Sequence, residues 1–564
     1  MPSDSHNPAA NARFRPRFRF DGWTILTLVI AGLVALPVLT VLAHVLVPSA
    51  EVWSHLYETV LSRYVINTLG LMLGVGFGAL LIGVGTAWLV VMCRFPGQRI
   101  FEWALLLPLA VPTYVIAYAY TDFLQFAGPV QTGLRDLFDW GRGDYWFPNI
   151  RSLGGAVVLM SLVLYPYVYL LTRAAFMEQS VCALEVGRTL GRGPWRLFSS
   201  VAIPLARPAI VGGLALALME ALNDFGAVQF FGVDTFTTGI YRTWFGMGEA
   251  AAAAQLAACL LMFVLVLLLL ERFSRRSARF HHTTGTYREL PQYRLSGGRA
   301  LLAFLACALP IAIGFLVPAV LLTEMHLRVG DPLMGTRFWE FAWNSLRLAT
   351  AAAVVAVTLA VVIGYGVRLQ PRPLTRAAAR IASVGYAIPG SVVAVGILIP
   401  LGWMDQQINL FARERFGVLP GLLLTGTMVA LVYAYVVRFL AVSFNTVEAS
   451  LTKVTPNMDA ASRTLGQTAG RTLARVHLPV MRSSLLAAGI LVFVDVMKEL
   501  PATVILRPFD FDTLAVRAFE LASDERLAQA STSALGIVGV GIVPVILLSL
   551  AMRKSRPGGK RGCS

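Results

Sequence analysis

Long apolar segments dominate this sequence, and a lipid bilayer is the surrounding that such segments require. A membrane-crossing helix needs roughly 20 apolar residues. Only 14% of the residues are charged, against about a quarter in a soluble domain. Because unpaired backbone groups are costly in lipid, each long apolar stretch is predicted to be a helix. The twelve predicted spans are 23–47, 65–92, 101–127, 152–177, 207–230, 250–271, 300–323, 343–369, 377–404, 420–443, 484–507 and 529–552.

The distribution of positive charge predicts how these spans are oriented. The formal net charge is +16. With the N-terminal tail placed inside, 31 of the 47 Lys and Arg residues fall on the inner side and 12 on the outer side. Positive charge marks cytoplasmic loops, so both termini are predicted to be cytoplasmic in a bacterial inner membrane. The first apolar stretch is too long for the core of a cleaved signal peptide. Because the charge is spread over loops, no nucleic-acid partner is expected.

The chain repeats itself, which predicts two similar halves. A shift of 275 residues places Arg188-Thr-Leu-Gly191 on Arg463-Thr-Leu-Gly466. Earlier in the halves the shift is 277, which places Pro112 on Pro389. Each half holds six spans, so the two copies enter the membrane from the same side and are parallel repeats. The predicted units are a basic tail (1–22), a first six-helix repeat (23–271), a cytoplasmic linker (272–299), a second repeat (300–552) and a basic tail (553–564).

A cytoplasmic loop before the fifth span of each half carries the most informative pattern. A segment suited to a short amphipathic helix leads to a glycine, which permits a sharp turn. Nine residues later comes a hydrophobic segment that ends in proline, which limits helix continuation. The candidate residues are Glu185, Gly187, Arg188, Gly191 and Pro204 in the first loop and Asp459, Ala460, Arg463, Gly466 and Pro479 in the second.

Both loops resemble the EAA loop of ATP-binding-cassette (ABC) importer permeases, at the same spacing and in equivalent places. The resemblance implies an all-α fold of twelve helices, the type I importer permease fold. It also implies that each loop docks on an ATPase subunit and transmits its closure to the helices. The expected partners are two ATPase subunits and a periplasmic binding protein. The loops depart from the pattern at Val186-Gly187 and at Ala460, and Asp459 is a candidate substitute for the missing glutamate.

No nucleotide-binding motif accompanies these loops in the sequence. A P-loop needs glycines that cradle phosphate and a following Gly-Lys pair. The Gly559-Lys560 pair is followed by Arg561 in a polar tail, with no strand before it. We therefore expect a transport subunit that is not an enzyme. It is expected to have no catalytic residues, no bound cofactor and no high-affinity metal site, while a partner subunit hydrolyses ATP.

The segments after each loop resemble those of fused, twelve-span iron(III) importer permeases. These are Ala221 to Trp244 and Asp495 to Glu525. The resemblance implies ferric iron as cargo, delivered by the binding protein, while thiamine and other small-solute permeases share the fused layout. A secondary transporter with parallel six-helix repeats is the alternative from another class. It would need no ATPase and leaves the twin loops unexplained.

Several polar residues near the ends of the fifth spans are candidates for the translocation pathway: Asn223, Asp224, Asp495, Lys498 and Glu499. Asp224 and Glu499 are 275 residues apart, so they are repeat-equivalent. Carboxylates in a membrane are costly and indicate function by default, and two of them would suit a trivalent cation. The alternative is local pairing, because Lys498 lies three residues after Asp495 on one helix face.

Other polar and special residues receive structural interpretations. Arg173 and Arg438 lie late in the predicted fourth spans and are expected to extend toward the cytoplasmic interface. The aromatic run Tyr114, Tyr118 and Tyr120 is expected to be an interfacial anchor. Pro112 and Pro389 are expected to kink the third span of each half.

Overall fold

The computed structural model describes residues 22–178, 193–276, 292–331, 335–452 and 454–554. It is an all-helical membrane protein with one short two-stranded contact, as the sequence predicts. The elements of the first half are α1 (Gly22–His44), α2 (Ala50–Thr59), α3 (Leu61–Met92), β1 (Cys93–Arg94), α4 (Gln98–Ala104), η1 (Leu107–Ala110), α5 (Thr113–Leu124), α6 (Pro129–Phe138), α7 (Leu153–Glu178), α9 (Pro194–Leu197), η2 (Phe198–Ala202), α10 (Ile203–Asn223), α11 (Gly226–Phe230), α12 (Phe236–Gly246) and α13 (Ala250–Arg276).

The second half repeats this order of elements. Its elements are β2 (Tyr293–Arg294), α14 (Gly298–Ile311), η3 (Ala312–Leu316), α15 (Val317–Arg328), α16 (Thr336–Leu369), α17 (Pro373–Ala382), η4 (Gly385–Ala387), α18 (Gly390–Phe416), α19 (Met428–Leu451), α20 (Pro456–Thr464), α21 (Ala469–Thr472), η5 (Leu473–His477), α22 (Leu478–Met497), α23 (Pro501–Leu506), α24 (Leu514–Ser523) and α25 (Leu527–Lys554).

The twelve predicted spans correspond to helices long and apolar enough to cross a membrane. Within the described residues, eleven such spans are continuous, and the twelfth is a pair of segments bent by 88° at Pro112. In the second half the backbone also breaks before Pro389, between η4 and α18. The fifth spans end at Asn223 and Met497, and short helices follow each of them. Proline explains the first two breaks, because it removes a backbone donor and disfavours helix before it.

Close packing of α3 on α7 uses a row of small residues. Gly70, Gly74 and Gly78 stand four residues apart, and a Cβ atom on each would fall 2.3–3.1 Å from Leu153, Val157 or Ser161 of α7. Glycine at this spacing lets two helix backbones approach closely. Because lipid tails are as apolar as leucine, such packing contributes more to helix association in a membrane than the hydrophobic effect does.

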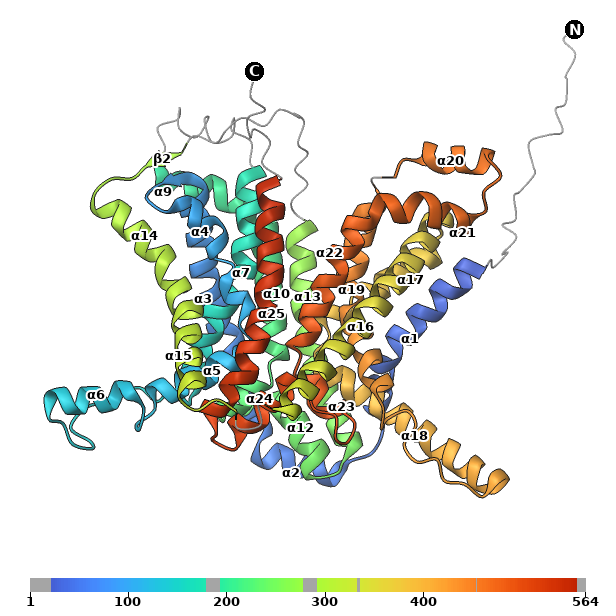
Figure 1. The fold of residues 1–564 in the computed structure, drawn as a ribbon, viewed down its shortest axis with the longest axis horizontal. Helices are drawn as coiled ribbons and strands as arrows, with labels where there is room; N and C mark the ends of the chain where they lie inside the picture. Colours follow the sequence, from blue (N-terminus) through green and yellow to red (C-terminus); the bar gives the residue numbers. More distant parts are fainter. Residues whose placement is uncertain (1–21, 179–192, 277–291, 332–334, 453, 555–564) are drawn as a thin grey trace, which may run out of the picture.

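The first helix of each half packs against the other half. Helix α1 contacts α16, α17 and α18, while α14 and α15 contact α3, α4 and α5. Figure 1 shows this exchange, with α1 on the outer side of the second half and α14 on the outer side of the first. The halves converge at the end that carries α12, α23 and α24 and separate toward the end that carries α9 and α20.

The described ends of the chain lie on the same side as α20. The start of α1 and the end of α25 are both found there (Figure 1), as an even number of spans requires. The predicted linker, 272–299, begins inside α13, which continues to Arg276, and residues 277–291 lie outside the described part. Its far end forms β2, which pairs in parallel with β1 at the end of α3. This contact fixes the start of α14 to the first half.

Candidate functional site

Two cavities lie between the halves, one above the other. A small cavity of about 90 Å³ is lined by the breaks in the third and fifth spans of both halves and by α19. A larger cavity of about 630 Å³ continues toward Glu271 and Arg272 near the end of α13. The two share Tyr167, Tyr386 and Asp495 among their lining residues. All five predicted pathway residues line the small cavity: Asn223, Asp224, Asp495, Lys498 and Glu499.

Asp224 and Glu499 occupy equivalent positions and make equivalent contacts. Asp224 Oδ1 accepts hydrogen bonds from the amides of Ala227 (2.9 Å) and Val228 (3.3 Å) at the start of α11. Glu499 Oε1 and Oε2 accept from the amides of Ala502 (2.9 Å) and Thr503 (3.1 Å) at the start of α23. A carboxylate at a helix N-terminus satisfies donors that lack a helical partner. Both side chains therefore hold a broken span together, and both are buried.

Local pairing, the alternative drawn from the sequence, is present at Lys498. Its Nζ lies 2.9 Å from Asp495 Oδ1 on the same helix face. Asn223, the repeat-equivalent of Lys498, accepts a 2.6 Å hydrogen bond from the amide of Gly390 and so joins the two halves. A Cβ atom at Gly390 would fall 2.7 Å from Glu499 Oε1, so glycine permits this approach.

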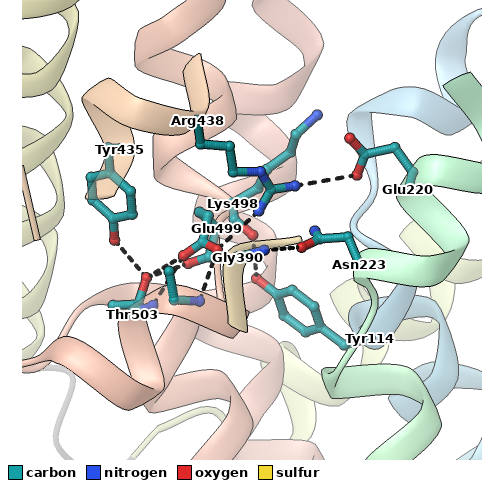
Figure 2. A network of polar contacts seen from close by, with 10 residues as sticks. Tyr114, Glu220, Asn223, Gly390, Tyr435, Arg438, Lys498, Glu499 and Thr503 are labelled. Atoms are coloured by element: carbon teal, nitrogen blue, oxygen red, sulfur yellow. Dashed lines mark hydrogen bonds and ion pairs between the residues drawn. The ribbon is translucent and has the colours of Figure 1, made fainter. Parts of the chain in front are cut away.

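Arg438 lies at the centre of the polar network in Figure 2. Its Nη1 is 3.1 Å from Glu499 Oε1, and its Nη2 is 3.7 Å from Glu220 Oε2 across the interface between the halves. The expectation that Arg438 extends toward the cytoplasmic interface is wrong. Helix α19 continues to Leu451, beyond the predicted end of the span, so Arg438 falls mid-helix, and its side chain is 5% exposed. A charge buried this deeply requires partners, and two carboxylates supply them.

The corresponding expectations for Arg173 and the tyrosines are also wrong. Arg173 is buried and lies 3.6 Å from Glu102. Tyr114, Tyr118 and Tyr120 are buried on α5. The bend at Pro112 turns α5 into the protein interior, and Tyr114 Oη donates to the carbonyl of Lys498 at 3.5 Å.

Glu220 is the site residue that sequence reasoning missed. It lines the small cavity, and 22% of its side chain is exposed, close to the 21% of Asp495. These two carboxylates are 275 residues apart in the sequence. The repeat shift therefore contained the signal, since Asp495 was already a candidate. Among the described residues that line this cavity, Glu220, Asp224, Asp495 and Glu499 are acidic, whereas Arg438 and Lys498 are basic.

The second predicted coupling loop forms the short helix α20. Asp459 accepts hydrogen bonds from Arg368 Nε at 2.9 Å and shares a 2.7 Å contact with His477 Nε2. Partial burial alone would raise the pKa of Asp459, but the hydrogen bonds from Arg368 and His477 hold that pKa below its usual value. Asp459 therefore anchors α20 to the helix bundle.

The opposite surface of α20 is open. Ala460, Arg463 and Gly466 are exposed, and Leu465 is 78% exposed. Gly466 has a φ of +72°, which suits glycine and allows the sharp turn that the sequence predicts. Pro479 lies near the start of α22 and Pro204 near the start of α10. Glu185, Gly187, Arg188 and Gly191 of the first loop lie outside the described residues.

Replacing Asp459 with asparagine is expected to loosen α20. The lost charge weakens contacts that contribute about 1–2 kcal/mol, so amide exchange in residues 456–464 should become about 5- to 30-fold faster. Because the pKa of Asp459 is lowered in the fold, its contribution is complete at neutral pH and is lost as the pH falls through that pKa. Hydrogen–deuterium exchange measures this effect. Arg463→Gln, on the exposed surface, is the control, and equal exchange in both variants would contradict the anchoring role.

Comparisons with known proteins agree with this architecture. Residues 79–279 match the family described as the binding-protein-dependent transport system inner membrane component. The molybdenum transport system permease protein ModB of Escherichia coli K12 is 31% identical over 175 residues, which cover 31% of this chain and 71% of that protein. The chain belongs to this family of ABC permeases. It is therefore a multi-pass inner-membrane transport subunit.

A relative of full length has the same fused arrangement. The Fe(3+)-transport system permease protein FbpB 2 of Haemophilus influenzae is 27% identical over 544 residues, which cover 95% of this chain and 98% of that protein. ModB of the same organism is 27% identical over 170 residues, which cover 29% of this chain and 71% of that protein. Relatives of this ABC permease are thus named for more than one cargo.

Proposed function

We propose that this ABC permease imports ferric iron that a periplasmic binding protein delivers, driven by a separate ATPase. The acidic lining of the cavity between the halves is the observation that carries the choice of cargo. Its four carboxylates against two basic side chains favour a cation and oppose an oxyanion such as molybdate. Among the relatives, the Fe(3+)-transport permease is the one that aligns over 95% of the chain.

The shape of the halves supports an importer that alternates between two openings. The small cavity lies where the halves converge, and the large cavity lies where they separate (Figure 1). The excess of Lys and Arg assigns the side that carries α20 to the cytoplasm. In this conformation the pathway therefore opens inward, and the binding protein docks on the opposite side.

Coupling to ATP is assigned to the two loops before the fifth spans. The exposed surface of α20, with Ala460, Arg463 and Leu465, is available to a partner. Helix α20 is tied to α16 through Asp459 and Arg368 and continues through α21 and η5 into α22. Movement of a docked ATPase would thus reach α22, which carries Asp495. Two ATPase subunits, one on each loop, would hydrolyse ATP, and this chain would bind no cofactor.

Uptake into proteoliposomes tests this proposal. They would contain the permease and its ATPase, with ferric iron and the binding protein on the outer-facing side. We expect ATP-dependent iron accumulation, lost when Gly191 and Gly466 are both replaced by leucine, because a bulky residue obstructs each turn.

Three other outcomes would contradict parts of the proposal. ATP-dependent accumulation of thiamine or molybdate without iron would replace the cargo and keep the importer. Iron uptake without an ATPase would indicate a secondary transporter. Full activity in the double glycine variant would remove the loops from coupling. Correct folding of that variant is checked by its elution as a single peak on gel filtration.

A further inference from the structure

The two carboxylates best placed to meet a cargo cation each contact a basic side chain of the protein itself. Glu220 Oε2 lies 3.7 Å from Arg438 Nη2, and Asp495 Oδ1 lies 2.9 Å from Lys498 Nζ. Glu220 and Asp495 are repeat-equivalent. In this conformation the protein's own cations therefore occupy the positions where a cargo cation would bind.

The two basic residues have no counterparts in the first half. Lys498 corresponds to Asn223, and Arg438 corresponds to Val163 or Ser161 by the two repeat shifts. The acidic pair is thus shared between the halves, while both cations come from the second half. A purely structural ion pair has no need of this asymmetry, but a device that acts when the halves move against each other requires it.

Arg438 is held firmly on one side and loosely on the other. Glu499, its nearer partner, also accepts hydrogen bonds from the amide of Thr503 and from Thr503 Oγ1 at 2.7 Å. Tyr435 in turn contacts Thr503 Oγ1 at 2.5 Å. These groups all belong to the second half (Figure 2). The longer contact, to Glu220, crosses to the first half. Separation of the halves would break this contact and leave Arg438 paired with Glu499.

We propose that Arg438 and Lys498 are tethered competitors that displace the cargo cation from Glu220 and Asp495. When the halves separate at the outer side, Glu220 is free to bind the cation. When they close into the conformation described, Arg438 returns to Glu220, and like-charge repulsion drives the cation into the 630 Å³ cavity. The same contact prevents the cation from binding again from the cytoplasmic side. This inference rests on the proposed cation cargo.

Binding of terbium to the purified permease without nucleotide tests the inference. Tb³⁺ is a trivalent cation that prefers oxygen ligands, and tyrosine excites its luminescence at short range. Tyr167 and Tyr386 line the same cavities, so bound Tb³⁺ would be detected. We expect Arg438→Gln to bind Tb³⁺ about 10-fold or more tightly than the natural chain does, within the usual range of coupling between two sites.

Matched variants separate competition from other effects. Arg438→Lys keeps the charge and should bind Tb³⁺ as weakly as the natural chain. The double variant Glu220→Gln with Arg438→Gln removes the carboxylate as well and should lose the added binding. Lys498→Gln, whose position is 28% exposed, should also strengthen binding, and it provides the test if Arg438→Gln does not fold.

The outcomes distinguish this inference from the proposed function. Unchanged Tb³⁺ affinity in the folded Arg438→Gln or Lys498→Gln variants would overturn the competitor role, even if the natural chain transports iron. Stronger Tb³⁺ binding that persists in the double variant would also overturn it, because Glu220 would not be the ligand. Stronger binding that depends on Glu220, in a protein that never transports iron, would support the competitor and contradict the ferric cargo.

Discussion

Replacing Glu499 with glutamine is expected to lower the free energy of unfolding by about 3–5 kcal/mol, the cost of removing one partner from a buried ion pair. Glu499 neutralises Arg438, whose side chain is 5% exposed, and also caps α23. Glutamine removes the charge and turns an amide group toward donors that need an acceptor. Chemical unfolding of the detergent-purified protein, followed by intrinsic fluorescence, measures the loss.

A double-mutant cycle assigns this cost to the ion pair. Arg438→Met removes the cation, so the double variant Glu499→Gln with Arg438→Met should recover most of the stability. Asp224→Asn is the matched control. Asp224 caps α11 in the same way, and among the described residues no Arg or Lys pairs with it, so we expect about 1 kcal/mol. Equal losses in Glu499→Gln and Asp224→Asn would contradict the importance of Arg438. Loss of transport in Glu499→Gln alone would not place Glu499 in the pathway.

Replacing Glu220 with glutamine and Asp495 with asparagine is expected to abolish uptake while the protein stays folded. These carboxylates line the cavity and are partly exposed. Each charged contact contributes about 1.5–3 kcal/mol, so each single variant should lower uptake roughly 10- to 100-fold. Initial rates in proteoliposomes measure the effect. The double variant should fall below detection.

Two controls make this result specific. Glu324→Gln removes a carboxylate that is 47% exposed and pairs with Arg328 away from the cavities, and it should transport normally. ATP hydrolysis by the assembled complex should persist in Glu220→Gln, because the coupling loops are untouched. Normal uptake in the double variant would remove both residues from the pathway, whereas loss of hydrolysis would indicate a structural defect.

The sequence was sufficient for the helices and their repeat, because both depend on local composition. Apolar length alone predicts spans in lipid, where each helix satisfies its own backbone. Equal spacing of Gly191 and Gly466 within their loops revealed the two halves. The φ of +72° at Gly466 shows why glycine stands there. The same spacing contained Glu220, which reasoning from single segments overlooked.

Contacts between segments distant in the sequence could not be derived in this way. Arg438 was placed near the membrane surface because the end of its span was set too early, and its pairing with Glu220 spans 218 positions across the interface between the halves. Tyr114 was taken for an interfacial residue because the bend at Pro112 directs α5 inward. Hydropathy describes where a residue lies along a helix, not which neighbours surround it.

The sequence by itself thus determined the membrane environment, the helix count, the two parallel repeats and the coupling-loop motif. Only the tertiary structure decided which polar groups face the cavities and which are consumed in holding the broken spans. Asp224 and Glu499 cap helices, while Glu220 and Asp495 reach open space. The physical reason is that a carboxylate in a membrane must find donors or cations. Which partner it finds depends on how the halves are packed together.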